Sequence, residues 1–426
     1  MSRVSRIAVI GTGYVGLTTG ACLAKLGHEV VCTDNNPSRI SELDAGRMPI
    51  LEDGLEEIVK DAVDGGLLRF TTANAEAAAW CEFAYLCVPT PQGDDGSADL
   101  SYIEAAASEI GPSLEPDAIV INKSTVPVGS TRVVERALGR SDVHVVSNPE
   151  FLREGSAVHD FLHPDRIVIG ADDQSAAIRV QSLYVSITAP FIVTDPASAE
   201  TIKYAANAFL ATKISFINAV AAVTESVGAD INDVVLGMGF DKRIGDQFLR
   251  PGPGWGGSCF PKDSRALVKI AEDAGYEFGL LKGVIAVNEE QFDRVAEKAV
   301  ELCGGSIDGK RVGAWGLTFK ARTDDLRESP SLAVLGRLAQ KGAIVRAFDP
   351  AVSTDIAGIE VVDDPYDAVD GADVLLVLTE WDDFKWFDLD EVATRMAHRR
   401  VVDARNLLDR AGLARRGFEY RGIGRN

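Results

Sequence analysis

Residues 6–16 have the sequence Arg-Ile-Ala-Val-Ile-Gly-Thr-Gly-Tyr-Val-Gly, and this stretch decides the fold. An apolar run typical of a buried strand, Arg6–Ile10, leads into three glycines with the spacing G-x-G-x-x-G, which open a segment of helical periodicity. Gly11 permits a tight turn, Gly13 lets the backbone approach a pyrophosphate, and Gly16 allows the helix to pack closely on the strand. The free N–H groups and the partial positive charge at the start of the helix favour a phosphate there. The stretch therefore predicts a dinucleotide-binding turn.

An acid at the end of the second apolar run indicates which dinucleotide this turn would bind. Asp34 ends the predicted strand Glu29–Asp34, and its carboxylate can accept hydrogen bonds from both hydroxyls of an adenosine ribose but would repel a 2′-phosphate. We therefore predict NAD rather than NADP as the cofactor. Arg39 leaves an alternative open, because an arginine at this place can bind a 2′-phosphate or stack on adenine. A Rossmann-like domain that binds no nucleotide, with glycines kept for packing, also stays open.

The region around this motif alternates apolar runs with Ala-rich amphipathic stretches, which is typical of a doubly wound α/β domain. The predicted strands are Arg6–Ile10, Glu29–Asp34, Phe83–Val88, Ala118–Lys123, His144–Val146 and Arg166–Ile169. Between them lie predicted helices such as Val15–Leu26 and Leu100–Ile110. We predict an N-terminal NAD-binding Rossmann domain over residues 1–196.

The middle of the chain, residues 197–300, has almost no strand pattern. Ala197–Val227 predicts one long helix of Ala, Leu, Ile and Val with isolated polar residues, and apolar character on most faces requires burial. A second subunit would cover such faces, although burial within one chain would also suffice. We predict a helical dimerisation domain here, and a homodimer or higher homo-oligomer.

From residue 301 to residue 426 the α/β alternation starts again, with predicted strands Arg311–Trp315, Ile344–Phe348 and Val374–Leu378 around a predicted helix, Pro330–Lys341. Three segments match the N-terminal region: RVGAWGLTFK matches IAVIGTGYVGLT, IVRAFDPAV matches EVVCTDNNP, and VLLVLTEWD matches FAYLCVPTP. We predict an α/β fold with two Rossmann-like doubly wound domains, related by duplication and joined by a long central helix and the helical dimerisation domain. Because the second copy lacks the complete glycine motif, we expect it to bind something other than a dinucleotide.

The composition limits the partners of the protein. Lys and Arg total 43 against 64 Asp and Glu, and the net charge of −21 disfavours nucleic acid and membranes and requires local cations for any phosphorylated substrate. We expect no apolar run long enough to span a bilayer, and the start MSRVSRIAVIGTGYVG has no signal-peptide pattern, so we expect a cytoplasmic protein. Neither a metal site nor a disulfide framework is predicted, because no CxxC pair occurs among Cys22, Cys32, Cys81, Cys87, Cys259 and Cys303.

One segment predicts covalent chemistry. Residues 250–263 have the sequence RPGPGWGGSCFPKD, in which glycine and proline favour a shaped loop whose backbone can approach a ligand closely. Cys259 ends this loop, with Lys262 and Asp263 just beyond it. A thiol beside a cation and at the start of a predicted helix should have a lowered pKa, which would make it a nucleophile. A cysteine that merely packs a turn is the alternative.

Two further pairs of polar residues strengthen the covalent interpretation. Lys203 and Asn207 lie four residues apart on the predicted long helix, and a cation beside an amide donor is suited to stabilising an oxyanion, unless both only face solvent. Glu150 and Glu154, in NPEFLREG, could share a helical face, and one carboxylate could activate a water. An acidic first turn that complements a helix dipole is the alternative for this second pair.

Eight motifs, in this order, cover nearly the whole chain: GTGYVG, CVPTP, KSTVPVGS, NPEFLREGSAVHDF, PDRIVIG, the helix with Lys203 and Asn207, RIGDQFLRPGPGWGGSCFPKD and GLTFKARTDDLRESP. With them the sequence resembles the UDP-glucose/GDP-mannose dehydrogenase family, more loosely beyond Pro330. The resemblance implies that the primary alcohol of a nucleotide sugar is oxidised by NAD to an aldehyde, captured by Cys259 as a thiohemiacetal, oxidised again to a thioester and hydrolysed. The lysine–amide pair would stabilise the oxyanions. GGSCFPKD, with no histidine before the cysteine, favours UDP-glucose as the substrate.

The resemblance also implies roles for individual residues. Glu150 would serve the hydrolysis, and Asp263 with Thr125 would hold a water near the reacting carbon. The residues implied to contact NAD are Gly11, Gly13, Tyr14, Val15, Gly16, Asp34, Arg39, Thr90, Thr125, Glu154, Lys262 and Arg327. Those implied to bind the UDP-sugar, partly through the C-terminal domain at 301–426 and with Arg243 reaching in from a partner subunit, are Glu150, Phe151, Leu152, Arg153, Glu154, Lys203, Asn207, Arg243, Phe248, Leu249, Arg250, Pro251, Gly252, Gly256, Lys320 and Arg405.

Three alternative functions stay open. A related enzyme would oxidise GDP-mannose or UDP-N-acetylmannosamine and would differ only in short uncharged contacts. A non-catalytic NAD-binding protein would have no use for a thiol, a lysine–amide pair and a water-activating carboxylate together. A simple hydroxyacid dehydrogenase would transfer a single hydride, need no nucleophile and yield one NADH per substrate.

Overall fold

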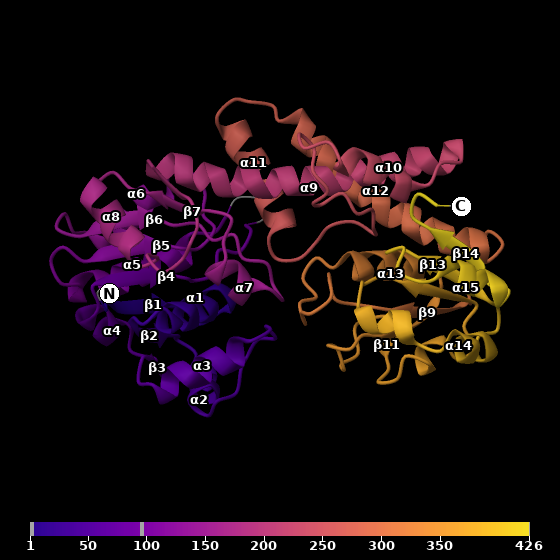
Figure 1. The fold of residues 1–426 in the computed structure, drawn as a ribbon, viewed down its shortest axis with the longest axis horizontal. Coiled ribbons are helices and arrows are strands. Elements are labelled where there is room, and N and C mark those ends of the chain that lie inside the picture. Colours follow the sequence, from indigo (N-terminus) through magenta and orange to yellow (C-terminus); the bar gives the residue numbers. More distant parts are fainter. Residues whose placement is uncertain (1–3, 94–97, 426) are drawn as a thin grey trace. The chain divides into compact units, whose positions relative to one another are not determined.

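The computed structural model describes residues 4–93 and 98–425, and every candidate residue named above lies within them. The chain divides into two compact units. The first contains residues up to Ala206 together with Arg265–Gly275, and the second contains Asn207–Ser264 together with residues from Tyr276 onward. One helix, α9 (Pro196–Val227), begins in the first unit and ends in the second (Figure 1).

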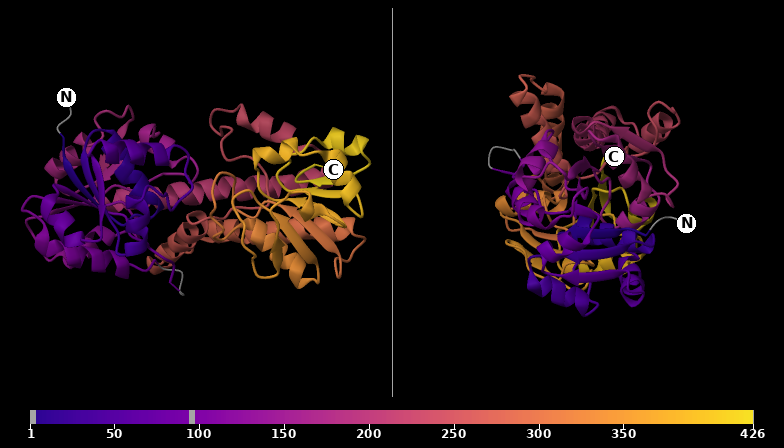
Figure 2. Two further views of the ribbon diagram at one scale, coloured as in Figure 1. Left: turned by 90° about the horizontal axis from the view of Figure 1, so that it is seen from below. Right: turned by 90° about the vertical axis from the view of Figure 1, so that its left-hand side faces the viewer.

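An eight-stranded sheet with the order β3-β2-β1-β4-β5-β6-β7-β8 forms the centre of the first unit. Its neighbouring strands are parallel, except that β6 and β7 meet in one antiparallel pair, and Figures 1 and 2 show helices on both faces. The strands are β1 (Arg6–Ile10), β2 (Glu29–Thr33), β3 (Leu68–Thr71), β4 (Phe83–Leu86), β5 (Ile119–Asn122), β6 (His144–Ser147), β7 (Ile167–Gly170) and β8 (Phe191–Thr194). The helices are α1 (Tyr14–Lys25), α2 (Pro37–Asp44), α3 (Leu55–Asp64), α4 (Asn74–Trp80), α5 (Ser101–Ile110), the 3-10 helix η1 (Gly111–Ser113), α6 (Ser130–Leu138), α7 (Ala157–Leu162) and α8 (Gln174–Ser182).

Strand β1 is apolar throughout because both of its faces are covered. Ile7 and Val9 belong to the core beneath α1, α3 and α7, whereas Ala8 and Ile10 belong to the core beneath α4, α5 and α6. The strand order reverses between β1 and β4. A doubly wound sheet binds its ligand at the carboxyl ends of the strands at such a reversal, which is where the turn after β1 lies.

The six predicted strands of this unit are all present, with ends shifted by at most two residues, as in β4, which ends at Leu86 rather than Val88. Strands β3 and β8 lie outside the prediction. The β3 sequence LRFT alternates polar and apolar residues over only four positions, and β8 is an edge strand whose Ile192 and Val193 are largely exposed. Short strands with one solvent-exposed face resemble loops in their amino-acid composition, so sequence patterns do not identify them.

The second unit contains a helical part followed by a six-stranded parallel sheet with the order β11-β10-β9-β12-β13-β14. This is the order of the first six strands of the N-terminal sheet, and the predicted fold class is confirmed. The helices are the part of α9 from Asn207 onward, α10 (Ile231–Gly239), α12 (Gly279–Leu302), α13 (Pro330–Gln340), η2 (Asp367–Val369), η3 (Asp382–Trp386), α14 (Leu389–Arg395) and α15 (Arg410–Arg415). Helix α11 (Phe260–Asp273) begins in this unit, and its residues from Arg265 onward belong to the first unit. The strands are β9 (Arg311–Trp315), β10 (Ile344–Phe348), β11 (Ile359–Val361), β12 (Val374–Val377), β13 (Arg400–Asp403) and β14 (Glu419–Gly422).

Helix α9 corrects one expectation. By length and composition it is apolar enough to cross a membrane, with a mean hydropathy of 1.4 over an 18-residue window of which 39% is buried. Its buried polar side chains nevertheless bind other parts of the protein. Glu200 accepts hydrogen bonds from the Gly129 and Thr131 amides at the start of α6, and Asn218 accepts one from the Gly252 amide. Such contacts are typical of a helix in a protein core.

Candidate active site

The glycine turn after β1 has the geometry that its sequence predicts. Gly11 has φ of +100°, and a side chain there would approach the Cys87 carbonyl oxygen to 2.7 Å. A side chain at Gly16 would come within 1.8 Å of the Gly11 carbonyl oxygen, so this glycine lets α1 pack on the turn. At Gly13 no heavy atom lies within 4 Å of an added Cβ, and α1 begins there without a side-chain cap. Open space and uncapped N–H groups are what a pyrophosphate requires.

Asp34 lies at the carboxyl end of β2, beside this turn. Its carboxylate accepts hydrogen bonds from the Thr12 amide at 3.0 Å, the Thr12 hydroxyl at 2.8 Å and the Asn36 amide at 2.9 Å. Burial opposes its ionisation, but these bonds and the Arg39 guanidinium outweigh burial and lower the pKa of Asp34. Arg39 lies 3.5 Å from the carboxylate, so this carboxylate stays charged at neutral pH.

Two loops meet next to the turn, at the ends of β4 and β5. The Thr90 hydroxyl donates to the Thr125 carbonyl at 2.8 Å, and the Ser124 hydroxyl donates to the Val88 carbonyl at 2.7 Å. Thr125 and Val15 are half-buried, whereas Thr90 is buried. The CVPTP and KSTVPVGS motifs are thereby joined by hydrogen bonds at the carboxyl ends of β4 and β5, the side of the sheet on which the glycine turn lies.

The loop between β6 and α7 corrects another expectation, because Glu150 and Glu154 do not lie on a helix. Pro149 disfavours helical conformation at the residue before it, and the Leu152 amide donates to the Glu150 carboxylate at 2.6 Å, which forms a local turn instead. The two carboxylates are therefore positioned by a loop. Glu154 is half-buried in this loop.

Glu150 forms a buried ion pair with Lys203 of α9. The Lys203 amine lies 2.7 Å from the carboxylate, and the two residues are 3% and 5% exposed. The alternative that Lys203 faces solvent is therefore wrong. Burial opposes ionisation of Glu150, but Lys203, the Leu152 amide and Lys123 outweigh it and lower the pKa of Glu150. A buried carboxylate and amine in direct contact are candidates for proton transfer.

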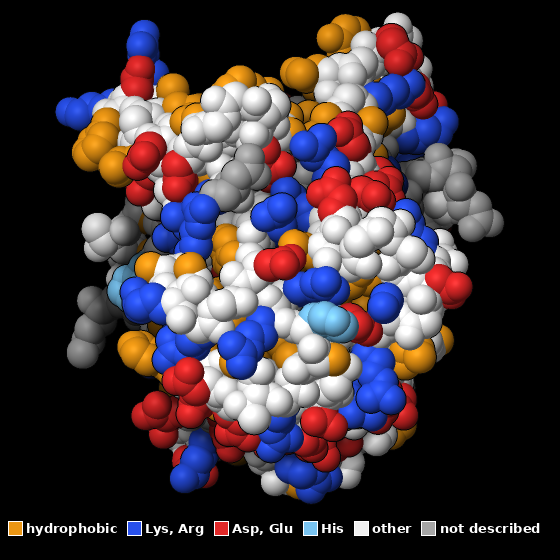
Figure 3. Space-filling model, turned by 90° about the vertical axis from the view of Figure 1, so that its right-hand side faces the viewer, with side chains coloured by type: hydrophobic (Ala, Val, Ile, Leu, Met, Phe, Trp, Pro, Cys, Tyr) orange, Lys and Arg blue, Asp and Glu red, His pale blue; other side chains and the backbone are white. Residues whose placement is uncertain are grey.

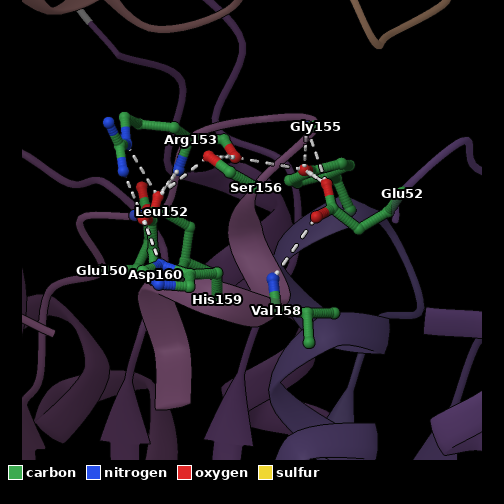
Figure 4. Close-up of polar contacts among 10 residues, drawn as sticks. Glu52, Glu150, Leu152, Arg153, Gly155, Ser156, Val158, His159 and Asp160 are labelled. Atoms are coloured by element: carbon green, nitrogen blue, oxygen red, sulfur yellow. Dashed lines mark hydrogen bonds and ion pairs between the residues drawn. The ribbon is translucent and has the colours of Figure 1, made fainter. Parts of the chain in front are cut away.

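Neighbouring side chains surround this pair. The Arg166 guanidinium stacks on the Phe151 ring at 3.7 Å from its centroid, and the Lys203 amine lies 5.5 Å from the same ring. Arg153 is exposed and forks onto Asp160 at 2.6 and 2.9 Å (Figure 4). Leu152 is half-buried.

The second unit holds the predicted nucleophile. Cys259 directly precedes α11, the Asp263 amide donates to its carbonyl at 2.9 Å, and the Ser258 hydroxyl lies 3.5 Å from its sulfur. The residue is half-buried, unlike the buried cysteines of the first unit. Asp263 is fully buried between the Lys262 amine and the Asn207 amide nitrogen, each at 2.6 Å. Asn207 is thus a buried partner of Asp263 rather than a residue in solvent.

The loop before Cys259 packs tightly on its own unit. A side chain at Gly256 would come within 2.0 Å of the Glu328 carbonyl oxygen, and one at Gly257 within 2.7 Å of the Phe319 ring. Gly252 donates to Asn218 at 2.9 Å, and an added Cβ there would lie 3.3 Å from the Arg405 guanidinium. These glycines therefore allow the loop to pack closely on its own unit. The sequence pattern predicts close approach to a ligand and does not indicate this packing role.

The remaining candidates differ in exposure. Arg405 donates to the Leu378 and Phe319 carbonyls at 2.8 and 3.2 Å and pairs with Glu380, whereas Lys320 is half-buried over the Phe319 ring. Arg243 is exposed and its guanidinium donates to the Asp241 carboxylate. Arg327 is also exposed and donates in the same way to Asp325. Within the segment before the loop, the buried members are Leu249, Pro251 and Gly252, the half-buried one is Phe248, with φ of +61°, and the exposed one is Arg250.

Sequence reasoning missed two residues that support the site. Lys123 is buried at the end of β5 and donates to Asn148 at 3.1 Å, and burial, opposed in part by Glu150, lowers the pKa of Lys123 to about 8. Glu52 is buried and accepts the Gly155 amide at 2.7 Å. A lysine next to an apolar strand is a weak signal for the first, whereas the sequence around Glu52 carries none. Among the described residues, no group of three or more His, Cys, Asp or Glu could hold a metal ion.

The second sheet has its own acid in the position of Asp34. Asp349 follows β10 and accepts hydrogen bonds from the Leu317 and Thr318 amides, the Thr318 hydroxyl and the Trp381 indole. The Ala351 amide donates to its other oxygen at 2.9 Å. Asp349 is 3% exposed, and five donors of the protein already contact its carboxylate. This burial fits the expectation that the second copy binds something other than a dinucleotide.

The fold and the glycine turn define a class of protein: a dehydrogenase with an NAD-binding domain. Residues 5–188, 197–290 and 313–410 match the models of the NAD binding, central and UDP binding domains of the UDP-glucose/GDP-mannose dehydrogenase family. The chain belongs to this family, and its N-terminal domain is an NAD-binding domain.

Relatives match over essentially the whole chain. UDP-glucose 6-dehydrogenase from Pseudomonas aeruginosa is 46% identical, covering 99% of this chain and 97% of the relative, and the enzyme of that name from Rhizobium meliloti is 44% identical, covering 99% of both. The structure of a UDP-glucose dehydrogenase from Pyrobaculum islandicum is 40% identical with a TM-score of 0.92, covering 100% of this chain and 99% of that one. A UDP-D-ManNAc dehydrogenase from Pyrococcus horikoshii is 28% identical with a TM-score of 0.88, covering 99% of both chains.

Proposed function

We propose that this protein oxidises UDP-glucose to UDP-glucuronate, reducing two NAD per sugar and consuming one water. The relatives named UDP-glucose 6-dehydrogenase, at 44–46% identity, support this substrate. The observation that carries the proposal is that the chain has two sets of reactive side chains, one in each unit. A buried Lys203–Glu150 pair lies in the first unit, and Cys259 beside the Asp263–Asn207 pair lies in the second. A protein that only bound NAD would need neither group.

The residues present fit NAD. The turn with Gly11, Gly13 and Gly16 leaves room and N–H groups for the pyrophosphate, and the charged Asp34 can accept hydrogen bonds from the ribose hydroxyls. When bound, NAD accepts a hydride at its nicotinamide ring. The other residues proposed to contact NAD are Tyr14, Val15, Arg39, Thr90, Thr125, Glu154, Lys262 and Arg327.

In the first half of the reaction, the C6 hydroxyl of the sugar would release its proton to solvent and its carbon would release a hydride to bound NAD, which gives an aldehyde. The Cys259 thiolate then forms a C–S bond to that carbon, and the resulting oxyanion is stabilised by Lys203 and Asn207. Loss of a second hydride converts this thiohemiacetal into a thioester. The covalent link retains the reactive aldehyde between the two oxidations.

In the second half, water cleaves the thioester. Glu150 accepts a proton from the attacking water, while Asp263 and Thr125 hold water near the carbonyl carbon. The C–S bond breaks, the carboxylate is released, Cys259 is restored as a thiolate, and Glu150 gives its proton to solvent. The charged state of Glu150, which its contact with Lys203 favours, is the state that a base requires.

We propose that the UDP-sugar is held by the loop after β6, the loop before Cys259 and the C-terminal domain. The family model of that domain carries the description "UDP binding domain" and matches residues 313–410. The basic members supply the cations that a diphosphate needs on a chain of net charge −21. The residues concerned are Phe151, Leu152, Arg153, Glu154, Arg243, Phe248, Leu249, Arg250, Pro251, Gly252, Gly256, Lys320 and Arg405.

A related sugar is the second candidate substrate, because the Pyrococcus horikoshii structure carries the name UDP-D-ManNAc dehydrogenase. Its 28% identity is lower than the 40% of the Pyrobaculum islandicum UDP-glucose dehydrogenase, and serine rather than histidine precedes Cys259. Both facts favour UDP-glucose.

We propose a homodimer or higher homo-oligomer formed through α9 from Phe209 onward. Exposed apolar residues recur at helical spacing along it, with Phe209 65%, Phe216 53% and Val223 59% exposed. On α10 and just beyond it, Leu236 and Phe240 are 60% and 79% exposed. A second copy of this surface would cover them, which fits a symmetric contact.

We further propose that the protein is cytoplasmic and binds neither membrane nor nucleic acid. The cysteines are free thiols, which suits a reducing compartment. Acidic and basic side chains are interspersed over the face that Figure 3 draws, so that face presents no extended basic surface for phosphate backbones. The apolar length of α9 is explained by the core and the proposed subunit contact.

The test is to count NADH. Purified protein with limiting UDP-glucose and excess NAD should yield two NADH per UDP-glucose, measured by absorbance against product quantified by chromatography. One NADH per sugar, or release of an aldehyde, would contradict the covalent mechanism. A panel with GDP-mannose and UDP-N-acetylmannosamine should give much lower kcat/KM, and a higher value for either would change the assigned substrate.

A further inference from the structure

The loop between β6 and α7 carries Glu150 but belongs to neither a helix nor a strand, so its shape depends on how its two ends are held. At its start, the Asn148 side chain accepts hydrogen bonds from the Lys123 amine at 3.1 Å and the Tyr184 hydroxyl at 2.8 Å. It also donates to the Val168 carbonyl at 2.7 Å. This end is therefore fixed to the core of the sheet.

The other end of the loop is held by a carboxylate from a distant part of the chain. Glu52, which precedes α3 and is 7% exposed, accepts the Gly155 amide at 2.7 Å and the Val158 amide at 3.4 Å. Figure 4 shows the Glu52 carboxylate between these two residues. Gly155 has φ of +75°, a conformation that favours glycine, so the chain turns at the point where it is held.

The same carboxylate also contacts the dinucleotide turn. The Tyr14 hydroxyl, from the first residue of α1, donates to Glu52 and accepts the Gly155 amide at 2.9 Å. Burial and the contact with Glu52 raise the pKa of Tyr14, so its hydroxyl stays a donor. Glu52, Tyr14 and Gly155 form one cluster, here termed the clasp, in which each member contacts the other two.

We propose that Glu52 is a positioning residue for thioester hydrolysis: through the clasp it holds the loop that presents Glu150 against the dinucleotide turn. This inference rests on the proposed function. Hydrolysis is the step that depends on Glu150 as a base, whereas the first hydride transfer depends on NAD and the second depends on NAD and the Cys259 thiohemiacetal. Loss of Glu52 should therefore slow release of the product more than formation of the thioester. Displacement of a reacting group by about 1 Å can cost about 100-fold in rate.

The test follows single turnovers of Glu52→Ala, Glu52→Gln and, as a matched control, Glu57→Gln on the exposed face of α3. Stopped-flow absorbance resolves a burst of NADH from the steady state, and acid-quenched mass spectrometry measures the fraction of subunits that carry the thioester. We expect Glu52→Ala to slow the steady state tenfold to 100-fold, to keep the burst rate within about threefold, and to raise the acylated fraction. Glu57→Gln should match the unmodified protein.

The conservative variant separates geometry from charge. The amide oxygen of Glu52→Gln can still accept the Gly155 amide, so we expect its steady-state rate to stay within about threefold of the unmodified protein. Equal slowing of burst and steady state in Glu52→Ala would overturn the proposal, since that is the result of general damage. A Glu52→Gln variant as slow as Glu52→Ala would overturn it as well.

Two further measurements keep the proposal testable. If Glu52→Ala does not fold, Tyr14→Phe takes its place, because it removes the hydroxyl of the clasp and should also slow the steady state more than the burst. Adding Glu52→Gln to Tyr14→Phe should slow the steady state no further. Hydrogen exchange needs no turnover: the Gly155 and Val158 amides should lose protection in Glu52→Ala. If the unmodified protein yields one NADH per sugar, the proposed function fails, and hydrogen exchange still decides whether the clasp holds the loop.

Discussion

Cys259 lies between a glycine-rich loop and the first turn of α11, and the residue is half-buried. The buried cysteines of the first unit contrast with it, because burial raises the pKa values of the Cys22, Cys81 and Cys87 thiols to about 12. Those thiols are therefore inert at neutral pH, and accessibility separates Cys259 from them.

Replacement of this sulfur provides the first residue-scale prediction. Cys259→Ser should lower turnover by about 1,000-fold or more, because a neutral hydroxyl is a far weaker nucleophile than a thiolate. NAD affinity, measured by fluorescence titration, should not change, since Gly11 and Asp34 lie in the other unit. Cys303→Ser, at the end of α12, is the control and should keep full activity. Near-normal turnover of Cys259→Ser would remove the nucleophile from the mechanism.

Lys123 provides a prediction about pH. Its ammonium is buried near Glu150, Lys203, Cys87 and the rings of Phe161 and Tyr184, and burial lowers its pKa from 10.5 to about 8. Between these two values the unfolded chain binds more protons at this residue than the folded protein does. Stability therefore rises with pH in that window, by up to about 1.4 kcal/mol per pH unit.

The measurement is the difference in Tm between the unmodified protein and Lys123→Met. As pH rises from 7.5 to 9.5, we expect the Tm of the unmodified protein to increase relative to that of the variant, because only the former loses a buried charge. A difference that stays constant over this range would show that the amine does not titrate there.

At the scale of elements, α9 combines two kinds of surface. Its first half buries Glu200, Lys203 and Asn207, whose partners lie on α6, the Glu150 loop and α11. From Phe209 onward it leaves an apolar stripe exposed. The sequence predicts the length of this helix correctly, because Ala, Leu, Ile and Val continue without a breaker. It does not predict which polar residues are buried, because their partners come from distant parts of the chain.

The exposed stripe leads to an element-scale prediction. Phe216→Asp places a charge in the middle of the stripe, where an apolar contact between subunits would exclude water, and should dissociate the oligomer. Sedimentation velocity at micromolar concentration should show the variant as a monomer. Ile178→Asp on α8, an exposed apolar residue of the first unit, is the control and should leave the oligomer intact. An unchanged sedimentation coefficient for Phe216→Asp would exclude this surface from the interface.

Contacts between distant parts of the chain cannot be predicted from local sequence patterns. Glu52 and Gly155 are 103 residues apart in sequence, and no periodicity or spacing links them. Strands β11, β13 and β14 are likewise absent from the prediction. The β14 sequence EYRG has a buried side only because β13 and α15 lie beside it. Motifs therefore indicate candidate residues for the chemistry, whereas contacts such as that between Glu52 and Gly155 can be identified only in the folded chain.

At the scale of the whole molecule, one chain contains two sheets that share the order of six strands and have an acid in the same place. Asp34 and Asp349 each follow the second strand of their sheet and accept hydrogen bonds from the turn after the first strand. The sequence predicts this repeat because the turn, strand and acid are local. It cannot predict that the Trp381 indole donates to Asp349, because Trp381 comes from a loop after the fourth strand.

This pair of acids allows a matched comparison within one protein. Asp34→Asn replaces a charged acceptor of the ribose by a neutral amide, and hydrogen bonds to charged groups contribute about 1.5–3 kcal/mol each, so NAD should bind roughly tenfold to 100-fold more weakly. Discrimination against NADP should also decrease, because the repelling charge is lost.

Asp349→Asn should leave NAD affinity unchanged but lower Tm more than Asp34→Asn does, since several buried donors share its carboxylate. Fluorescence titration with NAD and NADP, together with thermal unfolding, separates the two outcomes. Comparable rates with NADP in the unmodified protein, or a loss of NAD affinity in Asp349→Asn, would mean that the two sheets do not divide their tasks in this way.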